Sequence, residues 1–349
     1  MKKTILDSLN RGLLDALGGD EKVCLLGEDI LDPYGGAFKV TRGCSSAYPQ
    51  RVIPTPISEA GLAGMAAGMA LRGMRPVLEV MFGDFVTLMA DQLINHISKF
   101  RWMYNGSVSV PLLIRTPMGG RRGYGPTHSQ SLEKLFLGVP GLTVVAPAGF
   151  SLPEFGYSAG EQLRRLILES DSPILFIENK LQYLLPELTR EDLSEFEVEV
   201  KYESSDPEHR FPVFIVRIKG APRAHVTLAA YGYMSELASQ AQFRLAYEEE
   251  IFTDLVVPTR LSPYWVTPLI EAANHSGKIL LVEEGTLTSG WGAEAAARVA
   301  EATGSRGVVI KRIAAKETPV PAATSLEQKM LPQLDDLMAA VRKMSKHND

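Results

Sequence analysis

Short apolar runs alternate along the chain with longer segments in which apolar residues recur at helical spacing. The apolar runs, typical of fully buried strands, cover residues 23–27, 76–80, 110–115, 142–147 and 174–178. Helical spacing covers residues 58–73, 84–104 and 153–170. Strands that are apolar on both faces and separated by helices form parallel sheets through right-handed crossovers. The pattern predicts one doubly wound α/β domain over residues 1–180.

Residues 181–223 break this alternation because they are rich in Glu and Pro and contain the polar stretch 202–210. We interpret them as an acidic linker with one embedded strand or hairpin at Phe211–Ile218. The alternation then resumes, with strands predicted at 226–230, 252–257 and 279–283 and helices at 235–249, 263–276 and 292–303. The predicted fold is therefore α/β with two doubly wound domains, the second and smaller one covering residues 224–349.

The composition is that of an ordinary globular protein, and the 349 residues exceed what one core usually organises. A net charge of -5, with Lys and Arg spread along the chain, argues against a nucleic-acid partner. No window approaches the roughly 20 apolar residues of a membrane span, and Asp7, Asn10 and Arg11 interrupt the apolar start. Two cysteines can form at most one disulfide, which is too few to stabilise so long a chain. We expect a cytoplasmic protein without a membrane segment.

The two cysteines differ in their surroundings. Cys24 lies in an apolar run and is best interpreted as a small buried hydrophobic residue. Cys44 follows Gly43 and precedes two serines, which leaves two interpretations, a reactive thiol and an ordinary loop residue. The second interpretation is the preferred one.

Candidate chemistry begins at the end of the first strand. Glu28 follows it directly, and ligands of open parallel sheets bind outside the carboxyl ends of strands. Ser58 and Glu59 open the next predicted helix, where a serine N-cap and an acidic first turn are also purely structural features. The helix continues with small residues at Gly61, Gly64 and Gly68, which do not form a dinucleotide-binding fingerprint. They indicate either a tightly packed interior or a subunit interface.

Three further segments follow. Phe85, at a strand-to-helix transition, is either a core residue or part of a site. Residues 119–131 hold four glycines, two arginines and His128, which predicts an exposed loop and makes His128 a functional candidate. We interpret residues 282–292 as structural. The remaining histidines have no metal-ligand spacing and are interpreted as incidental: His96, His209, His225, His275 and His347.

Five motifs, taken in order, resemble the beta subunits of pyruvate, branched-chain 2-oxo acid and acetoin dehydrogenases. They are Gly-Glu-Asp at 27–29, Thr-Pro-Ile-Ser-Glu-Ala-Gly at 55–61, Gly-Asp-Phe at 83–85, Arg-Thr-Pro-Met-Gly-Gly at 115–120 and His-Ser-Gln-Ser at 128–131. The resemblance runs from about residue 4 to residue 343. It implies a thiamine diphosphate pyrimidine-binding domain followed by a transketolase C-terminal-like domain. It also implies oxidative decarboxylation of a 2-oxo acid and acyl transfer to a lipoyl carrier, performed together with an alpha subunit.

The resemblance assigns roles to individual residues. Glu59 is expected to hydrogen-bond a ring nitrogen of the cofactor's aminopyrimidine and so to act in catalysis. Phe85 is expected to stack on that ring, Ile57 to line the pocket, and Glu28 to lie near the cofactor. His128, the second expected catalytic residue, would face the substrate channel and help bind the substrate or the lipoyl group.

An absent motif defines the expected partners. Enzymes of this cofactor class hold Mg²⁺ and the diphosphate through a Gly-Asp-Gly segment with a later Asn, whereas here Phe85 follows Gly83-Asp84 and Asn95 comes too soon. We therefore expect no metal ligands in this chain, Mg²⁺ on an alpha-type subunit, and an α₂β₂ tetramer or a homodimer. A lipoyl-bearing acyltransferase is a further expected partner. A structural potassium ion, bound by carbonyls near Leu112 and Ile167–Ser172 in many relatives, is left open.

Some features depart from the family pattern and leave alternatives. The linker at 181–223 is longer and more acidic than usual, which puts docking onto a large complex in doubt. Arg121 and Arg122 would either grip an extra carboxylate or phosphate of an unusual substrate or face solvent. The alternative functions are a half-site subunit of a non-oxidative carboligase or ketol transferase, and a non-catalytic scaffold. The missing glycine fingerprint disfavours a free-standing nicotinamide-binding enzyme.

Overall fold

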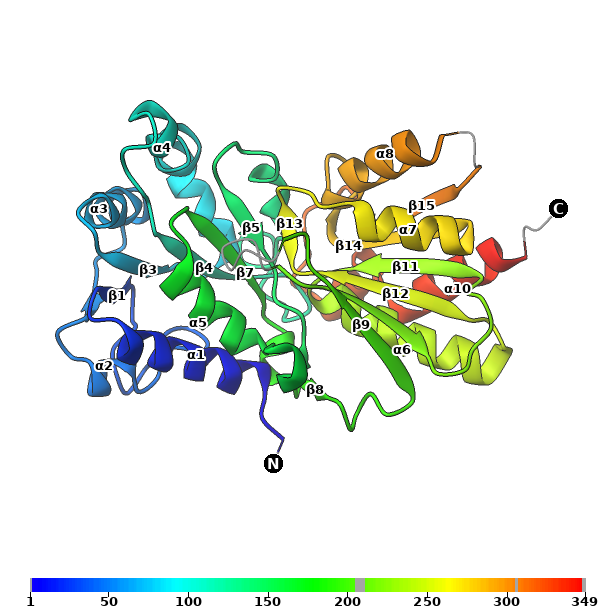
Figure 1. Ribbon diagram of the computed structural model, residues 1–349. Helices are drawn as coiled ribbons and strands as arrows, with labels where there is room; N and C mark the ends of the chain where they lie inside the picture. The colour runs from blue at the N-terminus through cyan, green and yellow to red at the C-terminus, as the bar shows by residue number, and fades with distance from the viewer. Residues whose placement is uncertain (1, 205–210, 305–306, 347–349) are drawn as a thin grey trace.

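The computed structural model describes residues 2–204, 211–304 and 307–346 and places two α/β halves side by side (Figure 1). The first half contains α1 (Ile5–Gly19), β1 (Val23–Gly27), α2 (Cys44–Ala47), β2 (Val52–Pro54), α3 (Glu59–Leu71), β3 (Arg75–Glu79), η1 (Gly83–Met89), η2 (Gln92–Ile97), α4 (Phe100–Met103), β4 (Leu113–Met118), η3 (Glu133–Leu135), β5 (Thr143–Val145), β6 (Phe150–Ser151), η4 (Pro153–Phe155), α5 (Ala159–Glu169), β7 (Ile174–Asn179) and η5 (Gln182–Leu184). The second contains β8 (Leu188–Thr189), β9 (Phe196–Lys201), β10 (Val213–Ile218), β11 (Val226–Ala230), α6 (Tyr233–Glu249), β12 (Thr253–Pro258), β13 (Arg260–Ser262), α7 (Thr267–Ser276), β14 (Lys278–Thr286), α8 (Trp291–Thr303), β15 (Val309–Ala315), α9 (Thr324–Met330) and α10 (Leu334–Ser345).

The first sheet has the strand order β13-β5-β7-β4-β3-β1-β2. All its pairs are parallel except β13 with β5. Its central strands are buried along their whole length, as sheets covered on both faces require. Helices α1 and α5 cover one face and touch at Gly12, where a Cβ atom would lie 2.3 Å from the Gly160 carbonyl oxygen. The predicted doubly wound α/β domain is confirmed.

The second sheet has the order β15-β14-β11-β12-β10-β9 and is mixed. Strands β15, β14, β11 and β12 pair in parallel, whereas β10 is antiparallel to both of its neighbours, β12 and β9. The pair of β9 with β10 runs from Val213 opposite Lys201 to Ile218 opposite Phe196. Of the strand or hairpin expected at Phe211–Ile218, the structure has the single strand β10, and its antiparallel partner β9 was not predicted. Residues 205–210 of the predicted polar stretch lie outside the described residues. The domain limits at residues 180 and 223 stay predictions.

One apolar core joins the two halves. It runs from α3 and η1 on the first sheet to the face of the second sheet that α7 and α8 cover. A second core lies under α6 and α10, and a third lies under α1 and α5. Strand β13, which follows β12 of the second sheet, returns to the first sheet and pairs with β5. The carboxyl edge of the first sheet is therefore held against the second half of the chain.

Two predicted helices differ from the structure. The continuous helix predicted at 84–104 is wrong, because the segment consists of a 3₁₀ helix (η1), a π-helix (η2) and one turn of α-helix (α4). Thr87 and Ser98 hydroxyls donate to the carbonyls of Asp84 and Ile94, and such back-bonding competes with regular helix geometry. The helix predicted at 153–170 begins only at Ala159, since Gly156 has φ +62° and ends a short 3₁₀ turn.

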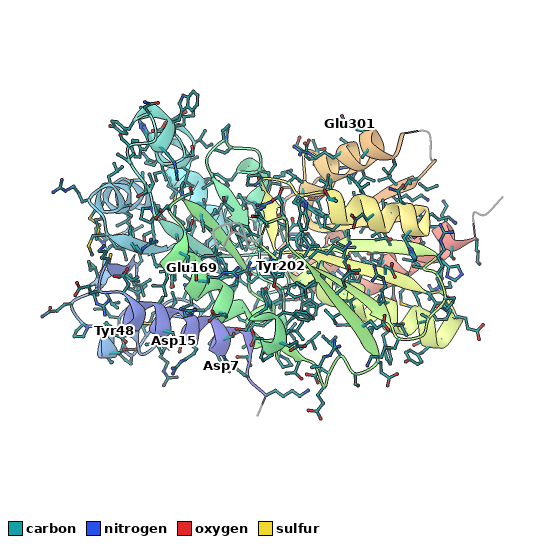
Figure 2. All side chains as sticks on the ribbon, viewed as in Figure 1. Asp7, Asp15, Tyr48, Glu169, Tyr202 and Glu301 are labelled. Carbon is teal, nitrogen blue, oxygen red and sulfur yellow. The ribbon has the colours of Figure 1, made fainter. Side chains whose placement is uncertain are left out.

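The first helix escaped prediction because Asp7 interrupts its apolar pattern. Asp7 instead completes a capping box, in which its carboxylate accepts from Thr4 and the Thr4 hydroxyl accepts from the Asp7 backbone N–H. The Asp7 side chain, labelled in Figure 2, lies on the exposed side of α1. Strands β2 and β15 and helices α9 and α10 were also not predicted. Among the described residues, no helix is both long and apolar enough to cross a membrane.

Both cysteines are buried free thiols. Burial raises the pKa of Cys24 to about 11 and that of Cys44 to about 12, so neither is a thiolate nucleophile near neutral pH. The interpretation of Cys24 as a buried hydrophobic residue is confirmed. Cys44 begins the short helix α2 and is fully buried, so it is neither a reactive thiol nor the ordinary loop residue that was the preferred interpretation.

Candidate functional site

The candidate residues follow strands that lie next to one another in the first sheet. Strands β2, β1, β3, β4 and β7 are adjacent and parallel, so their carboxyl ends meet at one edge. Glu28 follows β1, Glu59 follows β2 and Phe85 follows β3, while the loop with His128 follows β4. The edge of an open parallel sheet is where such folds bind ligands. The topology therefore gathers residues from four separate stretches of sequence.

Glu28 and Glu59 form a buried pair of carboxylates, with 6% and 7% of their surfaces exposed. Burial, and next the charge of Glu59, raises the pKa of Glu28, while the Ser58 backbone N–H opposes this shift. The Glu28 Oε1 atom has no hydrogen-bond partner in the structure. Among the described residues, no donor to the Glu59 carboxylate is found either. Buried acceptors without donors are costly, so this pair is incomplete within the chain.

The helix start at Glu59 differs from the expected serine cap. Ser58 occupies the N-cap position, but its hydroxyl caps no backbone N–H of α3. Its backbone N–H is instead directed to the Glu28 carboxylate. Ser58 is therefore the N-cap residue, as predicted, but without the side-chain hydrogen bond of a serine cap. Its backbone N–H ties the start of α3 to the end of β1.

The glycines of α3 lie on an open face. Gly61, Gly64 and Gly68 are exposed, as is Met65 with 45% of its surface. A Cβ atom added at Gly64 or Gly68 would meet nothing within 4 Å. Of the two interpretations of this stripe, the packed interior is therefore wrong. Ile57, just before the helix, is 78% exposed in the isolated chain.

Phe85 and His128 come together across two strand ends. Their ring centroids are 5.2 Å apart in an edge-to-face arrangement. Phe82 contacts both, with centroids 5.7 Å from Phe85 and 4.8 Å from His128. Phe85 is half-buried, which places it at the rim of the core. The structure thus forms two groups, Glu28 with Glu59 and Phe85 with His128, and no direct contact between the groups is found among the described residues.

The loop at residues 119–131 is anchored by the second half of the chain. The Gly120 backbone N–H donates to Glu284 (2.7 Å), and the backbone N–H groups of Arg121 and Gly123 donate to Glu327 (2.6 and 3.3 Å). Glu284 belongs to the segment predicted to be structural, and it also accepts from Asn179 (3.2 Å). The first residues of this loop, which was expected to be exposed, are therefore held in place by two carboxylates of the second half of the chain.

Arg121 and Arg122 are both half-buried. The Arg121 guanidinium donates to the carbonyl of Pro332 and to the side chain of Gln333 (3.2 Å), and Arg122 donates to the Lys180 carbonyl (2.8 Å). The solvent-facing alternative is therefore wrong for both residues. Each guanidinium binds its own chain, which also removes much of its capacity to grip a ligand.

Sequence reasoning missed several residues of this site. Phe82 and Tyr124 complete the aromatic group around His128, and Gln130 donates to Asp84 (2.8 Å). Lys180 is fully buried and donates to the His128 carbonyl. The available signal was its position directly after β7, on the same edge as the other candidates. Among the described residues, no group of three or more His, Cys, Asp or Glu side chains could hold a metal ion.

Comparison with known proteins adds the family context. Residues 2–184 match the family described as "Transketolase, pyrimidine binding domain", and residues 216–337 match "Transketolase, C-terminal domain". The chain is 31% identical over 344 residues to pyruvate dehydrogenase E1 component subunit beta-1, mitochondrial, of Arabidopsis thaliana, covering 97% of this chain and 88% of the relative.

Two further relatives are similar over nearly their whole length. The chain is 32% identical to 2-oxoisovalerate dehydrogenase subunit beta of Bacillus subtilis, covering 97% of this chain and 98% of the relative. Its fold is similar to a solved structure titled split gene transketolase, inactive beta4 tetramer, with a TM-score of 0.73, 19% identity and full coverage of both chains. At that identity the solved structure supports the fold alone.

Proposed function

The chain belongs to the family of beta subunits of 2-oxo acid dehydrogenase E1 components, and from this premise we propose that it provides half of a thiamine diphosphate site. With an alpha-type subunit it would decarboxylate a 2-oxo acid oxidatively and pass the acyl group to a lipoyl carrier. The observation that carries the proposal is the buried Glu28–Glu59 pair, in which the Glu28 Oε1 atom and the Glu59 carboxylate find no donor among the described residues. An aminopyrimidine, which brings N–H donors, fits such a pair.

Each residue of the edge would have a defined task. The bound cofactor would supply an acidic carbon and an electron sink for decarboxylation. Glu59 would accept a hydrogen bond from the pyrimidine ring and hold a proton there, with Glu28 beside it. Phe85 would stack on the ring, since its own ring is half-buried at the rim of the core. Ile57 would cover the ring's edge, and His128 would contact the substrate or the lipoyl group.

The partner proposal is supported by the open face of α3. No charged residue lies between Glu59 and Arg72, and exposed glycines allow the backbone of another helix to approach closely. Since the described residues offer no metal cluster, the alpha-type subunit would hold Mg²⁺ and the diphosphate. We propose an α₂β₂ tetramer, with a homodimer as the alternative for the isolated chain.

The potassium ion stays a proposal with a specific difficulty. The Arg75 guanidinium donates to the carbonyls of Ile167 (3.2 Å) and Ser170 (2.8 Å). The Leu112 carbonyl accepts from the Ile174 backbone N–H (2.9 Å). An ion near these segments would therefore share its oxygen ligands with donors of the chain.

Other assignments also remain proposals. A lipoyl-bearing acyltransferase would receive the acyl group, and lipoyl dependence would separate this function from a non-oxidative carboligation or ketol transfer. A scaffold has no need of an incomplete carboxylate pair, which disfavours that alternative. We keep the cytoplasm as the proposed compartment, supported by two buried free thiols.

The test is co-expression of this chain with the alpha-type subunit encoded in the same host. The purified complex would be assayed for thiamine diphosphate- and Mg²⁺-dependent oxidation of a panel of 2-oxo acids. Glu59→Gln is expected to lower kcat/KM by about 10²–10⁴-fold, the range for a positioned acid–base group. The control is Glu187→Gln, since Glu187 is also buried and its Oε2 atom also has no partner in the structure, while its Oε1 atom accepts from the Ala159 backbone N–H (2.9 Å) in another part of the domain.

Either of two results would overturn the proposal. Full activity of Glu59→Gln would remove the carboxylate from the cofactor site. A complex that forms but oxidises no 2-oxo acid, and that binds no thiamine diphosphate in a calorimetric titration, would favour the scaffold. Activity without any lipoyl acceptor would favour the carboligase or ketol transferase.

A further inference from the structure

Lys180 follows β7 and its side chain is fully buried. Its Nζ atom donates to the His128 backbone carbonyl. The same atom lies 5.2 Å from the ring centroid of Phe82 and 5.7 Å from that of Tyr124, within the range of cation–π attraction. The ammonium group therefore contacts His128 itself and two of the aromatic residues near it, Phe82 and Tyr124.

The charges around Lys180 exclude a role as an anion-binding residue. The negative charges near it are those of Asp84 from η1, Glu284 from β14 and Glu327 from α9. The other positive charge is that of Arg122 from the loop. Three carboxylates against two cations give no net positive charge with which to attract a carboxylate or phosphate. The carboxylates instead stabilise a buried ammonium, so this charge is part of the architecture.

His128 depends on its surroundings for its orientation. The flanking residues Pro126 and Thr127 are exposed, and the His128 backbone N–H bonds only within the turn, to Gly125 (3.3 Å). Its ring contacts Phe82 and Phe85 edge to face, and its Nδ1 lies 2.9 Å from the Thr127 hydroxyl. The bond from Lys180 is the connection that ties the His128 backbone to the sheet.

We propose that Lys180 is the positioning residue of His128, an ammonium clamp that fixes the loop of residues 119–131 to the end of β7 and sets the orientation of the imidazole. Lys180 itself does not touch the substrate. The inference deepens the proposed function and rests on it for the catalytic consequence, whereas the clamp itself is a property of the chain alone.

The clamp is sensitive to pH. Burial lowers the pKa of Lys180 to about 8, and Asp84, Glu284 and Glu327 oppose this shift. Below this pH the ammonium is charged and holds both the carbonyl and the aromatic rings. As pH rises through about 8 the amine becomes neutral, the cation–π attraction is lost and the hydrogen bond to the carbonyl weakens.

The first test needs no activity. The full chain would be labelled with ¹³C at histidine Cε1, and His128→Gln would identify the His128 resonance. In the wild type this resonance is expected to show a step near pH 8. Above pH 8, Lys180→Arg should keep the position that the wild type shows just below its step, because an arginine stays protonated. Lys180→Met should displace the resonance at every pH and show no step.

The matched control is Lys134→Met, since Lys134 is a half-buried lysine that donates to the Thr288 carbonyl (2.8 Å) on another loop. It should leave the step in place. Circular dichroism would confirm that each variant is folded, and if Lys180→Met does not fold, Lys180→Arg decides alone. A His128 step that persists unchanged in either Lys180 variant overturns the proposal.

The second test uses the complex with the alpha-type subunit. In the wild type kcat/KM should fall above pH 8, and in Lys180→Arg this fall should disappear. Lys180→Met should lower kcat/KM by about 10- to 100-fold at every pH, as misplacement of a catalytic group does. If the complex has no 2-oxo acid activity, the proposed function fails while the resonance still reports on the clamp. If Glu59→Gln abolishes activity but Lys180→Met keeps the wild-type pH profile, the Lys180 proposal alone fails.

Discussion

Two sets of buried carboxylates lie at neighbouring strand ends of the first sheet. One set is paired with a cationic side chain of the chain, and the other is not. Glu79 at the end of β3 pairs in register with Gly27 of β1, directly before Glu28. Glu79 belongs to a set with Glu178, and Glu28 belongs to a set with Glu59. All four carboxylates are less than a tenth exposed. Burial alone therefore does not separate them.

The first set is complete within the chain. The Arg115 guanidinium, 1% exposed, donates to Glu79 and to both oxygens of Glu178, one of them at 2.8 Å. The Tyr183 hydroxyl adds a further hydrogen bond to Glu178. The two carboxylates raise the pKa of Arg115, although its burial opposes this shift. Burial raises the pKa of Glu79 to about 7, and the charge of Arg115 opposes this shift. Both carboxylates nevertheless have a hydrogen-bond partner within the chain, so this set leaves little for a ligand to bind.

The second set has no cation. Glu28 accepts a hydrogen bond from the Ser58 backbone N–H, while its Oε1 atom has no partner in the structure. Burial raises the pKa of Glu28, and the charge of Glu59 raises it further. The chain thus keeps two acids in a place where folding alone gains nothing from them. The comparison teaches that the missing partner, rather than the residue type or its depth, distinguishes a site from a structural network.

The largest effect on stability is expected from Arg115→Met. The substitution leaves Glu79 and Glu178 buried without a cation, which typically costs about 3–5 kcal/mol. Urea denaturation of the isolated chain would measure the loss of unfolding free energy. The control Arg11→Met removes an exposed pair with Asp15 and should cost less than about 0.5 kcal/mol. Equal losses in both variants would contradict the structural role of the first set.

An intermediate effect is expected at Glu283, a further buried carboxylate. Burial, and next the charge of Glu133, raises its pKa to about 8, while the Gly292 backbone N–H (3.0 Å) opposes the shift. Its Oε2 atom has no partner in the structure. Since the folded chain retains this proton up to about pH 8, its contribution is fully present below the ordinary carboxyl pKa of 4.5 and is lost as pH rises through about 8.

The wild type should therefore lose at least about 1 kcal/mol of unfolding free energy between pH 5 and pH 8 relative to Glu283→Gln. Denaturant titrations of both proteins across this range would measure the difference. Parallel stability curves would show that Glu283 is already ionised in the folded chain. Glu283 lies on β14 of the second sheet and, like Glu28, has one carboxylate oxygen without a partner, so such a result would also weaken the rule drawn from the comparison.

The smallest effect is expected from Glu28→Gln in the isolated chain. Removing one acid of an uncompensated pair should leave the unfolding free energy unchanged or raise it by less than about 1 kcal/mol at pH 7, because folding gains nothing from the repulsion. Thermal or urea denaturation would show the sign. A loss of several kcal/mol would mean that the chain already contains a donor for Glu28, and the two sets would then no longer differ.

Much of the fold could be predicted from the sequence because burial on both faces leaves a direct trace in the residues. The predicted strands β1 and β11 have the observed limits, since apolar runs bounded by polar residues end where the strands end. The segment from Gly83 to Tyr104 could not be predicted in this way, because its apolar spacing suits a helix while Thr87 and Ser98 locally alter the hydrogen bonding. Likewise Asp7 disrupted the apolar pattern of α1 while forming its cap.

The sequence by itself determined the alternation of strands and helices, the candidate residues at strand ends and the missing diphosphate motif, because each of these depends on neighbours in the chain. Only the tertiary structure decided which charges are balanced. Arg115 and Glu178 are 63 residues apart, and Lys180 reaches a carbonyl 52 residues away. Such pairings depend on strand order and on the packing of the two halves, which no local pattern contains. For that reason the sequence revealed Glu59 and His128 but not Lys180, the residue that connects His128 to the sheet.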